Sequence, residues 1–300
     1  MSSIRKEVFP VHQSQSDFQS IERKTKIRKT VLRVVTYLML GIWGIVVLFP
    51  FYWMALTSVK PQNELFTPKA IYWTKNATGA NYTQLFRHFD FIKPIGNSAL
   101  VALITTLVSL AVSTMAAYAF SRYRFRGRRA MMIMFLSNNM FPTVLLLSPL
   151  YSIMRRLGLL YTPWALVVSY TTFTIPFSVW LLNGYFGDLP ISLEEAAMID
   201  GANRVQGFFK VVLPLLSQAL IATGVYIFMT SWNEFTYAVM FTNQNGRTVP
   251  VVLASLVGSF GVDWGLLCAG GVITIIPVCI MFFFAQKRLV QGLTAGAVKG

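Results

Sequence analysis

Few side chains of this chain could take part in polar chemistry, and the best ordered of them lie in one segment, residues 190–214. Glu195 and Asp200 stand there among small residues, so the segment could offer charge-assisted contacts to a basic partner at close range. Two adjacent amides, Asn138 and Asn139, could hydrogen-bond a polar solute. The sequence has no phosphate-binding loop, no Cys/His metal spacing and no G-x-S-x-G motif. These residues indicate binding and docking rather than catalysis.

Long apolar segments must position these groups. Six runs without Asp, Glu, Lys or Arg are 23 residues or longer, and a membrane-spanning helix needs about 20. We expect one span in each, at about residues 34–58, 97–121, 130–154, 162–186, 212–234 and 264–285. A seventh run, residues 248–262, has only 15 residues and is expected to be interfacial or re-entrant. The first run begins too late and is too long for a cleaved signal peptide.

The lysines and arginines between the runs predict the orientation. With the N-terminus inside, 18 of the 26 basic residues fall in cytoplasmic segments and eight outside, which is the bias that sets membrane topology. Arg155 and Arg156 on the outside are the one awkward feature. All acidic residues and both histidines also lie outside the runs. No proton relay is therefore visible, and transport would draw its energy from elsewhere.

The composition agrees with a membrane protein. Only 12% of residues are charged and 55% are hydrophobic, with a mean hydropathy of +0.56, whereas soluble chains carry about 25% charged residues. A soluble enzyme and a disordered chain are thereby excluded. The net charge of +15 clusters between apolar runs, which indicates topology and not nucleic-acid binding. Cys268 and Cys279 would lie about 16 Å apart on one helix, too far for a disulfide.

The segment 190–214 is expected to form a helix–turn–helix at the membrane surface. Ser192 and Glu195 have the spacing of a capping box, and Gly201 stands where a helix could end with a positive φ. Leu193, Ala197 and Gly201 would share one face. A second short amphipathic piece, residues 205–212, then leads to Pro214. A well-capped surface helix without a partner is the alternative reading.

Several motifs carry a resemblance to a known family. Residues Glu195-Ala196-Ala197, Asp200-Gly201-Ala202, Phe208 and Leu213-Pro214 resemble the EAA signature of ABC importer permeases. The chain from about residue 34 to 300 is similar to the carbohydrate (MalG-like) branch of the binding-protein-dependent importers. The motifs that match this branch are Ser58-Val59-Lys60-Pro61 with Glu64, Asn81-Tyr82, Asn97-Ser98, Leu150-Tyr151, Leu157-Gly158-Leu159 with Thr162, Trp232-Asn233-Glu234-Phe235 and Gly292–Gly300.

The resemblance implies an all-α, multi-pass protein of the bacterial inner (cytoplasmic) membrane, with six spans, both termini cytoplasmic and a cytoplasmic coupling helix between spans four and five. It implies a homologous second permease, two ABC ATPase subunits that bind ATP and Mg, and an extracytoplasmic solute-binding protein. The chain itself would hold no cofactor and no metal, would not be an enzyme, and would bind a sugar within the lipid bilayer. The residues implied in ATPase coupling are Glu195, Ala196, Ala197, Asp200, Gly201, Ala202, Leu213 and Pro214.

The sugar path is expected among polar and aromatic residues inside the spans. We expect Asn138 and Asn139, with Pro142 freeing backbone carbonyls beside them, to border a polar cavity. The other candidates are Tyr226, Trp232, Asn233 and Glu234, with Tyr170, Thr171, Thr172 and Thr230 as further possibilities. Each could instead join helices through hydrogen bonds or anchor a span at the interface.

The chain is thus expected to consist of three parts. Residues 1–33 form a basic, loosely ordered cytoplasmic tail, residues 34–289 the permease domain with its coupling loop at 190–212, and residues 290–300 a C-terminal tail that reaches the ATPase as an extended strand. One alternative is an ABC permease for a non-sugar or polyanionic solute. The other is a secondary transporter or channel that works alone, without an ATPase.

Overall fold

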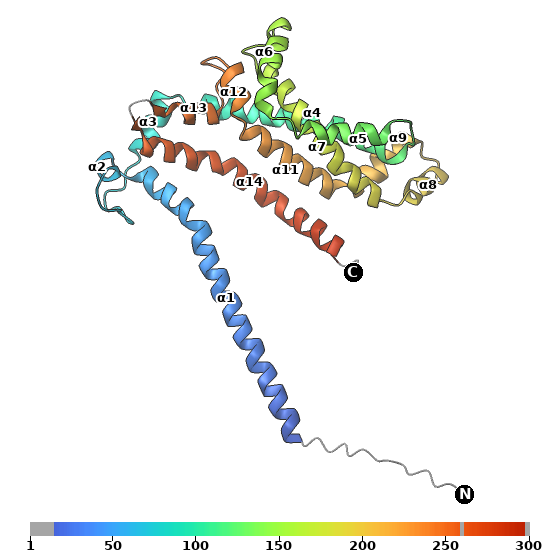
Figure 1. Cartoon of the computed structure of the whole chain (residues 1–300), viewed down its shortest axis with the longest axis horizontal. Coiled ribbons are helices and arrows are strands. Elements are labelled where there is room, and N and C mark those ends of the chain that lie inside the picture. Colours follow the sequence, from blue (N-terminus) through green and yellow to red (C-terminus); the bar gives the residue numbers. More distant parts are fainter. Residues whose placement is uncertain (1–14, 259–260, 298–300) are drawn as a thin grey trace. The chain divides into compact units, whose positions relative to one another are not determined.

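The computed structural model describes residues 15–258 and 261–297, and these are almost entirely helical (Figure 1). Two-residue strands, β1 and β2, pair antiparallel with Val257 opposite Val262. The elements are α1 (Gln15–Val59), α2 (Gln62–Leu65), α3 (Ala80–His88), α4 (Ile92–Arg122), α5 (Arg128–Asn138), η1 (Thr143–Leu146), α6 (Leu147–Arg156), α7 (Pro163–Asp188), α8 (Ser192–Ile199), α9 (Arg204–Gly207), the π-helix η2 (Phe208–Val212), α10 (Leu213–Leu215), α11 (Ser217–Trp232), α12 (Thr236–Phe241), α13 (Val249–Ser255), β1 (Val257–Gly258), β2 (Gly261–Val262) and α14 (Trp264–Ala297).

Four helical segments in the described residues are long and apolar enough to cross a membrane. They are Thr25–Val59 of α1, the whole of α4 and α7, and Trp264–Gln286 of α14. Two bent helix pairs raise the number to as many as six if each pair is one span. Four of the six expected spans therefore fall on continuous helices, and the other two fall on the bent pairs.

The two interruptions correct the expectation of continuous helices at residues 130–154 and 212–234. The first run breaks between Asn138 and Thr143 with a bend of 98°. Pro142 explains this break, because it lacks an N–H and disfavours helical geometry at the residue before it. The second run bends by 75° between Leu215 and Ser217. Pro214, one residue upstream of that bend, cannot donate a helical hydrogen bond either.

The chain divides into two compact units, Met1–Met54 and Ala55–Gly300. In the first unit α1 begins at Gln15, within the segment expected to be a loose tail, so part of that expectation is corrected. Between residues 34 and 52 the apolar side chains of α1 are exposed around the whole helix, for example Tyr37 and Ile45. A helix that is apolar on every side is typical of a membrane span.

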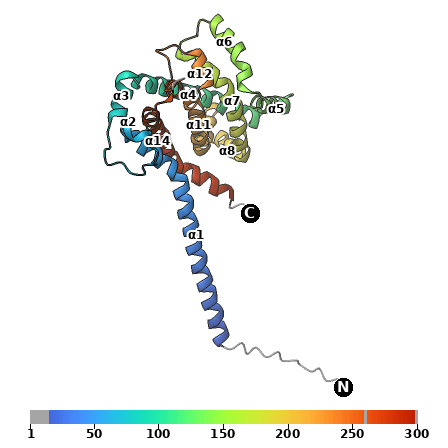
Figure 2. The ribbon, with the colours of Figure 1, turned by 60° about the vertical axis from the view of Figure 1, so that its left-hand side comes forward.

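The core of the second unit is built by α4, α7 and α11, which lie side by side in both views (Figures 1 and 2). The buried face of α4 carries small residues at helical spacing, including Ser98, Ala102, Thr105 and Ser109. Small side chains let membrane helices approach closely. Ser109 and Thr174 use that proximity to share a buried hydrogen bond of 2.8 Å between α4 and α7.

Two of the family motifs, at Asn81 and at Asn97, make contacts between segments that are distant in the sequence. The Asn81 amide donates to the backbone oxygens of Ser58 (2.9 Å) and Lys60 (3.0 Å). Asn97 donates to the carbonyls of Asn245 (2.9 Å) and Arg247 (3.0 Å). The Asn97 contact joins the start of α4 to the segment around Arg247. The distribution of lysines and arginines assigns both Lys93 and Arg247 to the extracytoplasmic side of the membrane.

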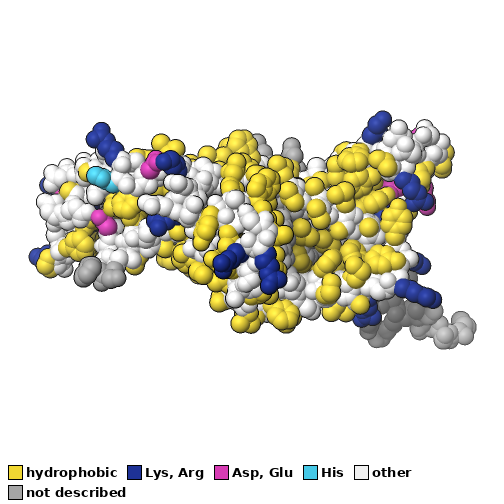
Figure 3. Space-filling view, turned by 90° about the horizontal axis from the view of Figure 1, so that it is seen from above, with side chains coloured by type: hydrophobic (Ala, Val, Ile, Leu, Met, Phe, Trp, Pro, Cys, Tyr) yellow, Lys and Arg dark blue, Asp and Glu magenta, His cyan; other side chains and the backbone are white. Residues whose placement is uncertain are grey.

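The C-terminal helix corrects a further expectation. The helix α14 continues through Ala297, so residues 290–297 are helical and not an extended strand; residues 298–300 lie outside the described part. Cys268 and Cys279 on this helix are free thiols, as expected. In the face shown in Figure 3, hydrophobic side chains occupy the middle and most charged ones gather toward the two ends. This distribution suits a protein whose middle lies in lipid.

Candidate functional site

The helix α8 lies with α9 at one end of the second unit, away from α3 and α13 (Figure 1). The expected capping box at its start is not formed. The N-cap position is occupied by Ile191, which has helical backbone angles, and Ser192 is the first residue of the helix. No side chain makes a capping hydrogen bond there. A capping box occurs instead at the start of α9, where the Asn203 side chain accepts from Gln206 N (2.8 Å) and the Gln206 side chain accepts from Asn203 N (2.9 Å).

The end of α8 agrees with the sequence analysis. Gly201 has φ +89°, a conformation that glycine adopts without strain. Ala202 N donates to Ala197 O (3.0 Å) and Gly201 N donates to Met198 O (3.1 Å), which is the double closure of a Schellman motif. This closure turns the chain sharply and directs it into α9.

The base of α8 is held by an arginine that the sequence analysis counted only as a topology signal. Arg122, the last residue of α4, donates from Nε to Glu194 Oε1 at 2.5 Å. Tyr118, one turn earlier on α4, donates to the other carboxylate oxygen of Glu194 at 2.8 Å. The Arg122 and Glu194 side chains are 8% and 12% exposed. The carboxylate that matters structurally is thus Glu194, not the neighbouring Glu195.

The solvent-exposed surface of α8, α9 and η2 is rich in apolar side chains. No residue of α8 is buried, and Ile199 is 86% exposed. Val205 and Phe209 are also exposed, as are the charged side chains of Glu195 and Asp200. Small residues beside these groups, Ala196 and Ala202, leave room for another protein to approach the backbone. The arrangement offers apolar burial and charge-assisted contacts but no catalytic group.

The helix α10 brings the last two motif residues, Leu213 and Pro214, to the bend before α11. The preceding η2 is a π-helix, and such turns are frequent at functional sites. In a regular α-helix the backbone N–H of residue 214 would donate to Lys210 O. Pro214 has no N–H, so regular α-helical bonding cannot continue there. The loop is therefore joined to α11 through a bent segment and not through one straight helix.

Asn138, expected beside a polar cavity, has a structural partner. Its Nδ2 donates to Thr172 O on α7 at 3.1 Å. Thr172 O lacks its usual helical donor four residues later, because that residue is Pro176. Asn138 supplies the missing hydrogen bond. The adjacent Asn139 is exposed and donates to Phe135 O of its own helix at 3.4 Å.

The remaining path candidates fall into two groups. Tyr226 on α11 is half-buried with its ring 4.5 Å from that of Phe177 on α7, and Asn233 is exposed. By contrast, Trp232 is 1% exposed and packs on Phe228. Glu234 accepts from the backbone N–H groups of Tyr237 and Ala238, so its carboxylate stabilises the start of α12.

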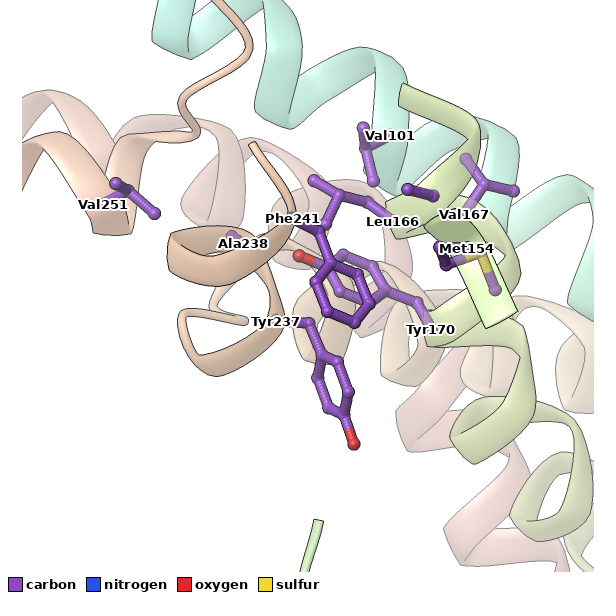
Figure 4. Close-up of a cluster of buried hydrophobic side chains, with 10 residues drawn as sticks. Val101, Met154, Leu166, Val167, Tyr170, Tyr237, Ala238, Phe241 and Val251 are labelled. Carbon is purple, nitrogen blue, oxygen red and sulfur yellow. The ribbon is translucent and has the colours of Figure 1, made fainter. Parts of the chain in front are cut away.

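Thr171 and Thr172 bond back to Val168 O, and Thr230 bonds to Tyr226 O. Tyr170 lies in a buried cluster with Tyr237, Phe241 and Met154 (Figure 4). The structure therefore brings Asn138 and Tyr226 to neighbouring parts of α7, at Thr172 and Phe177, and leaves Trp232 and Glu234 in other contacts.

Tyr237 is a residue that the sequence analysis missed. Its hydroxyl points away from the other labelled side chains in Figure 4 and donates to Thr143 O at 2.6 Å. Burial, together with the nearby Glu234 carboxylate, raises the pKa of Tyr237 to about 12. The hydrogen bond of this phenol fastens α12 to the broken segment between α5 and α6. Among the described residues no His, Cys, Asp and Glu side chains gather as a metal site.

Comparisons with known proteins show the family of the chain. Residues 109–295 match the family described as "Binding-protein-dependent transport system inner membrane component". The chain is 37% identical to the trehalose/maltose transport system permease protein MalG of Thermococcus litoralis, over 92% of this chain and 99% of that protein. It is 39% identical to the sulfoquinovosyl glycerol transport system permease protein SmoH of Agrobacterium fabrum, over 84% of this chain and 89% of that protein.

A solved structure shares the fold. The chain resembles one in the crystal structure of a bacterial ABC transporter involved in the import of the acidic polysaccharide alginate. The TM-score is 0.74 with 23% identity, over 93% of this chain and 99% of that one.

Proposed function

The chain belongs to the permeases of binding-protein-dependent ABC importers, and on that premise we propose that it conducts a sugar or oligosaccharide and that α8 docks onto an ATPase. Membership confirms the resemblance drawn from the sequence. The protein is a multi-pass inner membrane component and a non-catalytic transport subunit. Permeases of this family carry no cofactor.

The observation that carries the docking proposal is the exposed surface of α8 and α9. Burying a side chain such as Ile199 contributes about 1.5–3 kcal/mol, so an 86% exposed isoleucine beside the exposed Val205 and Phe209 favours a protein partner. At the Schellman turn the space around the Cβ position of Gly201 is open, so another protein can approach the backbone there. Glu195 and Asp200 would contact basic groups of the ATPase, while Leu213 and Pro214 join this surface to α11.

The proposed assembly contains this chain, a homologous second permease, two ATPase subunits and an extracytoplasmic solute-binding protein. Both termini lie in the cytoplasm, as the distribution of lysines and arginines indicates. The ATPases bind ATP and Mg, and their closure moves the docked helices. Such an external energy source suits a chain whose acidic and basic residues and histidines all lie outside its apolar runs.

The proposal of a sugar substrate rests on the relatives named for trehalose/maltose and sulfoquinovosyl glycerol transport. An aromatic ring and amides suit a sugar, and Tyr226, Asn139 and Asn233 are the path candidates whose surfaces remain available. Asn138, Trp232 and Glu234 would affect the sugar path indirectly, because they hold their helices in place. A polyanionic solute is the second candidate, since the solved structure of similar fold belongs to an importer of an acidic polysaccharide.

A substrate screen in the reconstituted complex tests the proposal. The complex with its binding protein is supplied with trehalose, maltose, sulfoquinovosyl glycerol or alginate oligosaccharides, and ATP hydrolysis is measured. We expect one of the neutral disaccharides to stimulate hydrolysis most. Stimulation by alginate oligosaccharides alone would favour the polyanionic solute. Uptake that continues when ATP hydrolysis is blocked would refute the ABC assembly and favour a lone carrier.

A further inference from the structure

Arg122 joins three helices at the end of the bundle that carries α8. Besides the ion pair with Glu194 on α8, it donates from Nη1 to Phe186 O and from Nη2 to Leu189 O, both at 3.1 Å. Phe186 lies in the last turn of α7, and Leu189 is its C-cap. One guanidinium therefore connects the end of α4, the end of α7 and the first turn of α8.

Arginine is suited to this position for a geometric reason. Its planar group offers five N–H donors in a fixed fork, and here they reach a carboxylate and two carbonyls in different directions. The carbonyls at a helix C-terminus lack intrahelical partners and carry partial negative charge. A lysine would bring the same charge but only a compact group with three donors. It could not hold all three acceptors in place together.

Burial distinguishes Arg122 from most arginines of the same loop. Its side chain is 8% exposed, whereas Arg124, Arg126 and Arg129 are exposed and Arg128 is only partly buried. A topology signal needs only charge near the membrane surface and does not require burial. The Arg122 contacts therefore call for an explanation beyond the orientation of the chain.

We propose that Arg122 is a positioning residue that makes α8 move as one body with α4 and α7. This inference rests on the proposed role of α8 as the docking helix. Tyr118 strengthens the link, because it donates to the second oxygen of Glu194. A force applied to α8 by the ATPase then reaches α4 and α7 directly, and not only through the turns at residues 189–191 and 201–203.

Spin-label distances in the whole complex test the inference without knowledge of the substrate. The free thiols are removed by Cys268→Ser and Cys279→Ser, and nitroxides are placed at Ser192→Cys at the start of α8, away from Ile199, and at Leu103→Cys on α4, both exposed positions. The label at residue 103 lies about 28 Å along α4 from Arg122, the residue that contacts α8. A separation of this size between the two labels is suited to double electron–electron resonance. Distances are recorded in nanodiscs before and after trapping with MgATP and vanadate.

We expect the same distance distribution in both states for the otherwise native chain. In Arg122→Gln, trapping should shift or split the distribution, because α8 then follows the ATPase without α4. Arg124→Gln is the matched control, since it removes the same charge from the same loop, and it should behave as the native chain. Glu194→Gln should also give a shift, and it decides the question if Arg122→Gln fails to assemble.

A shift in the native chain, or no shift in either variant that assembles, would overturn the inference. The docking role is tested separately by cross-linking Ile199→Cys to the ATPase with a bifunctional maleimide. Absence of that cross-link in the native background would refute the docking proposal itself. Loss of the cross-link only in Arg122→Gln would overturn the inference, because Arg122 would then be needed for docking and not for transmission.

Discussion

The substitution Gly201→Asp is expected to abolish uptake while the permease remains in the membrane. Gly201 has φ +89°, and a Cβ added there meets no atom within 4 Å. Within the isolated chain the cost is therefore limited to backbone strain, about 1–2 kcal/mol for a residue in the left-handed region. That amount shifts one exposed turn and does not unfold a membrane bundle. A complete loss of uptake must then arise from contact with the ATPase, where aspartate also adds a negative charge beside Asp200.

The assay combines uptake of the most stimulating sugar with co-purification of the ATPase on the tagged permease. Gly158→Asp is the matched control, because Gly158 also has a positive φ (+67°) and open space around its Cβ position but lies outside the α8 loop. We expect this control to retain most uptake and its ATPase. Gly201→Asn tests strain against charge, since asparagine tolerates the left-handed region better and carries no charge.

Two results would contradict this reasoning. Uptake near the native level in Gly201→Asp, with the ATPase still bound, would mean that α8 is not the coupling element. An equal loss in Gly158→Asp would mean that backbone strain alone, and not the docking surface, explains the defect.

Three further predictions concern orientation, packing and the loop. In a Cys268→Ser, Cys279→Ser background, cysteines at Ser2 and Gly300 should be shielded from an impermeant thiol reagent in intact cells and one at Gln84 labelled; labelling at either terminus would refute the topology. Asn138→Leu should lower the amount of assembled complex, because Thr172 O then lacks a donor at a cost of about 1–3 kcal/mol, whereas Asn139→Leu should not; full assembly with reduced uptake would instead place Asn138 on the path. Asn203→Ala removes the capping box at about 1 kcal/mol, so trypsin should cut the solubilised permease, separated from its ATPase, at Arg204 roughly fivefold faster; an unchanged rate would show that the cap does not order this loop.

The hydropathy and charge patterns were sufficient to predict the helical class, the continuous helices of α4, α7 and α14, and the free cysteines. They succeed because a bilayer requires long apolar helices whatever their neighbours are. The turn at Gly201 was also predictable, since a helix end with positive φ is a local property of the chain. The family followed from the spacing of the residues around Glu195.

Contacts between distant residues were decided only by the tertiary structure. The sequence placed Asn138 beside Pro142, but its partner is Thr172 O, whose donor is missing because of Pro176. Nothing in the sequence distinguishes an amide that completes a broken helix from one that faces a solute, since both need only a polar side chain near a proline. Likewise Arg122 and Glu194 are 72 residues apart, and charge counting treats every arginine of a loop alike. Only the packing of α4 against α7 buries one of them and gives it three acceptors.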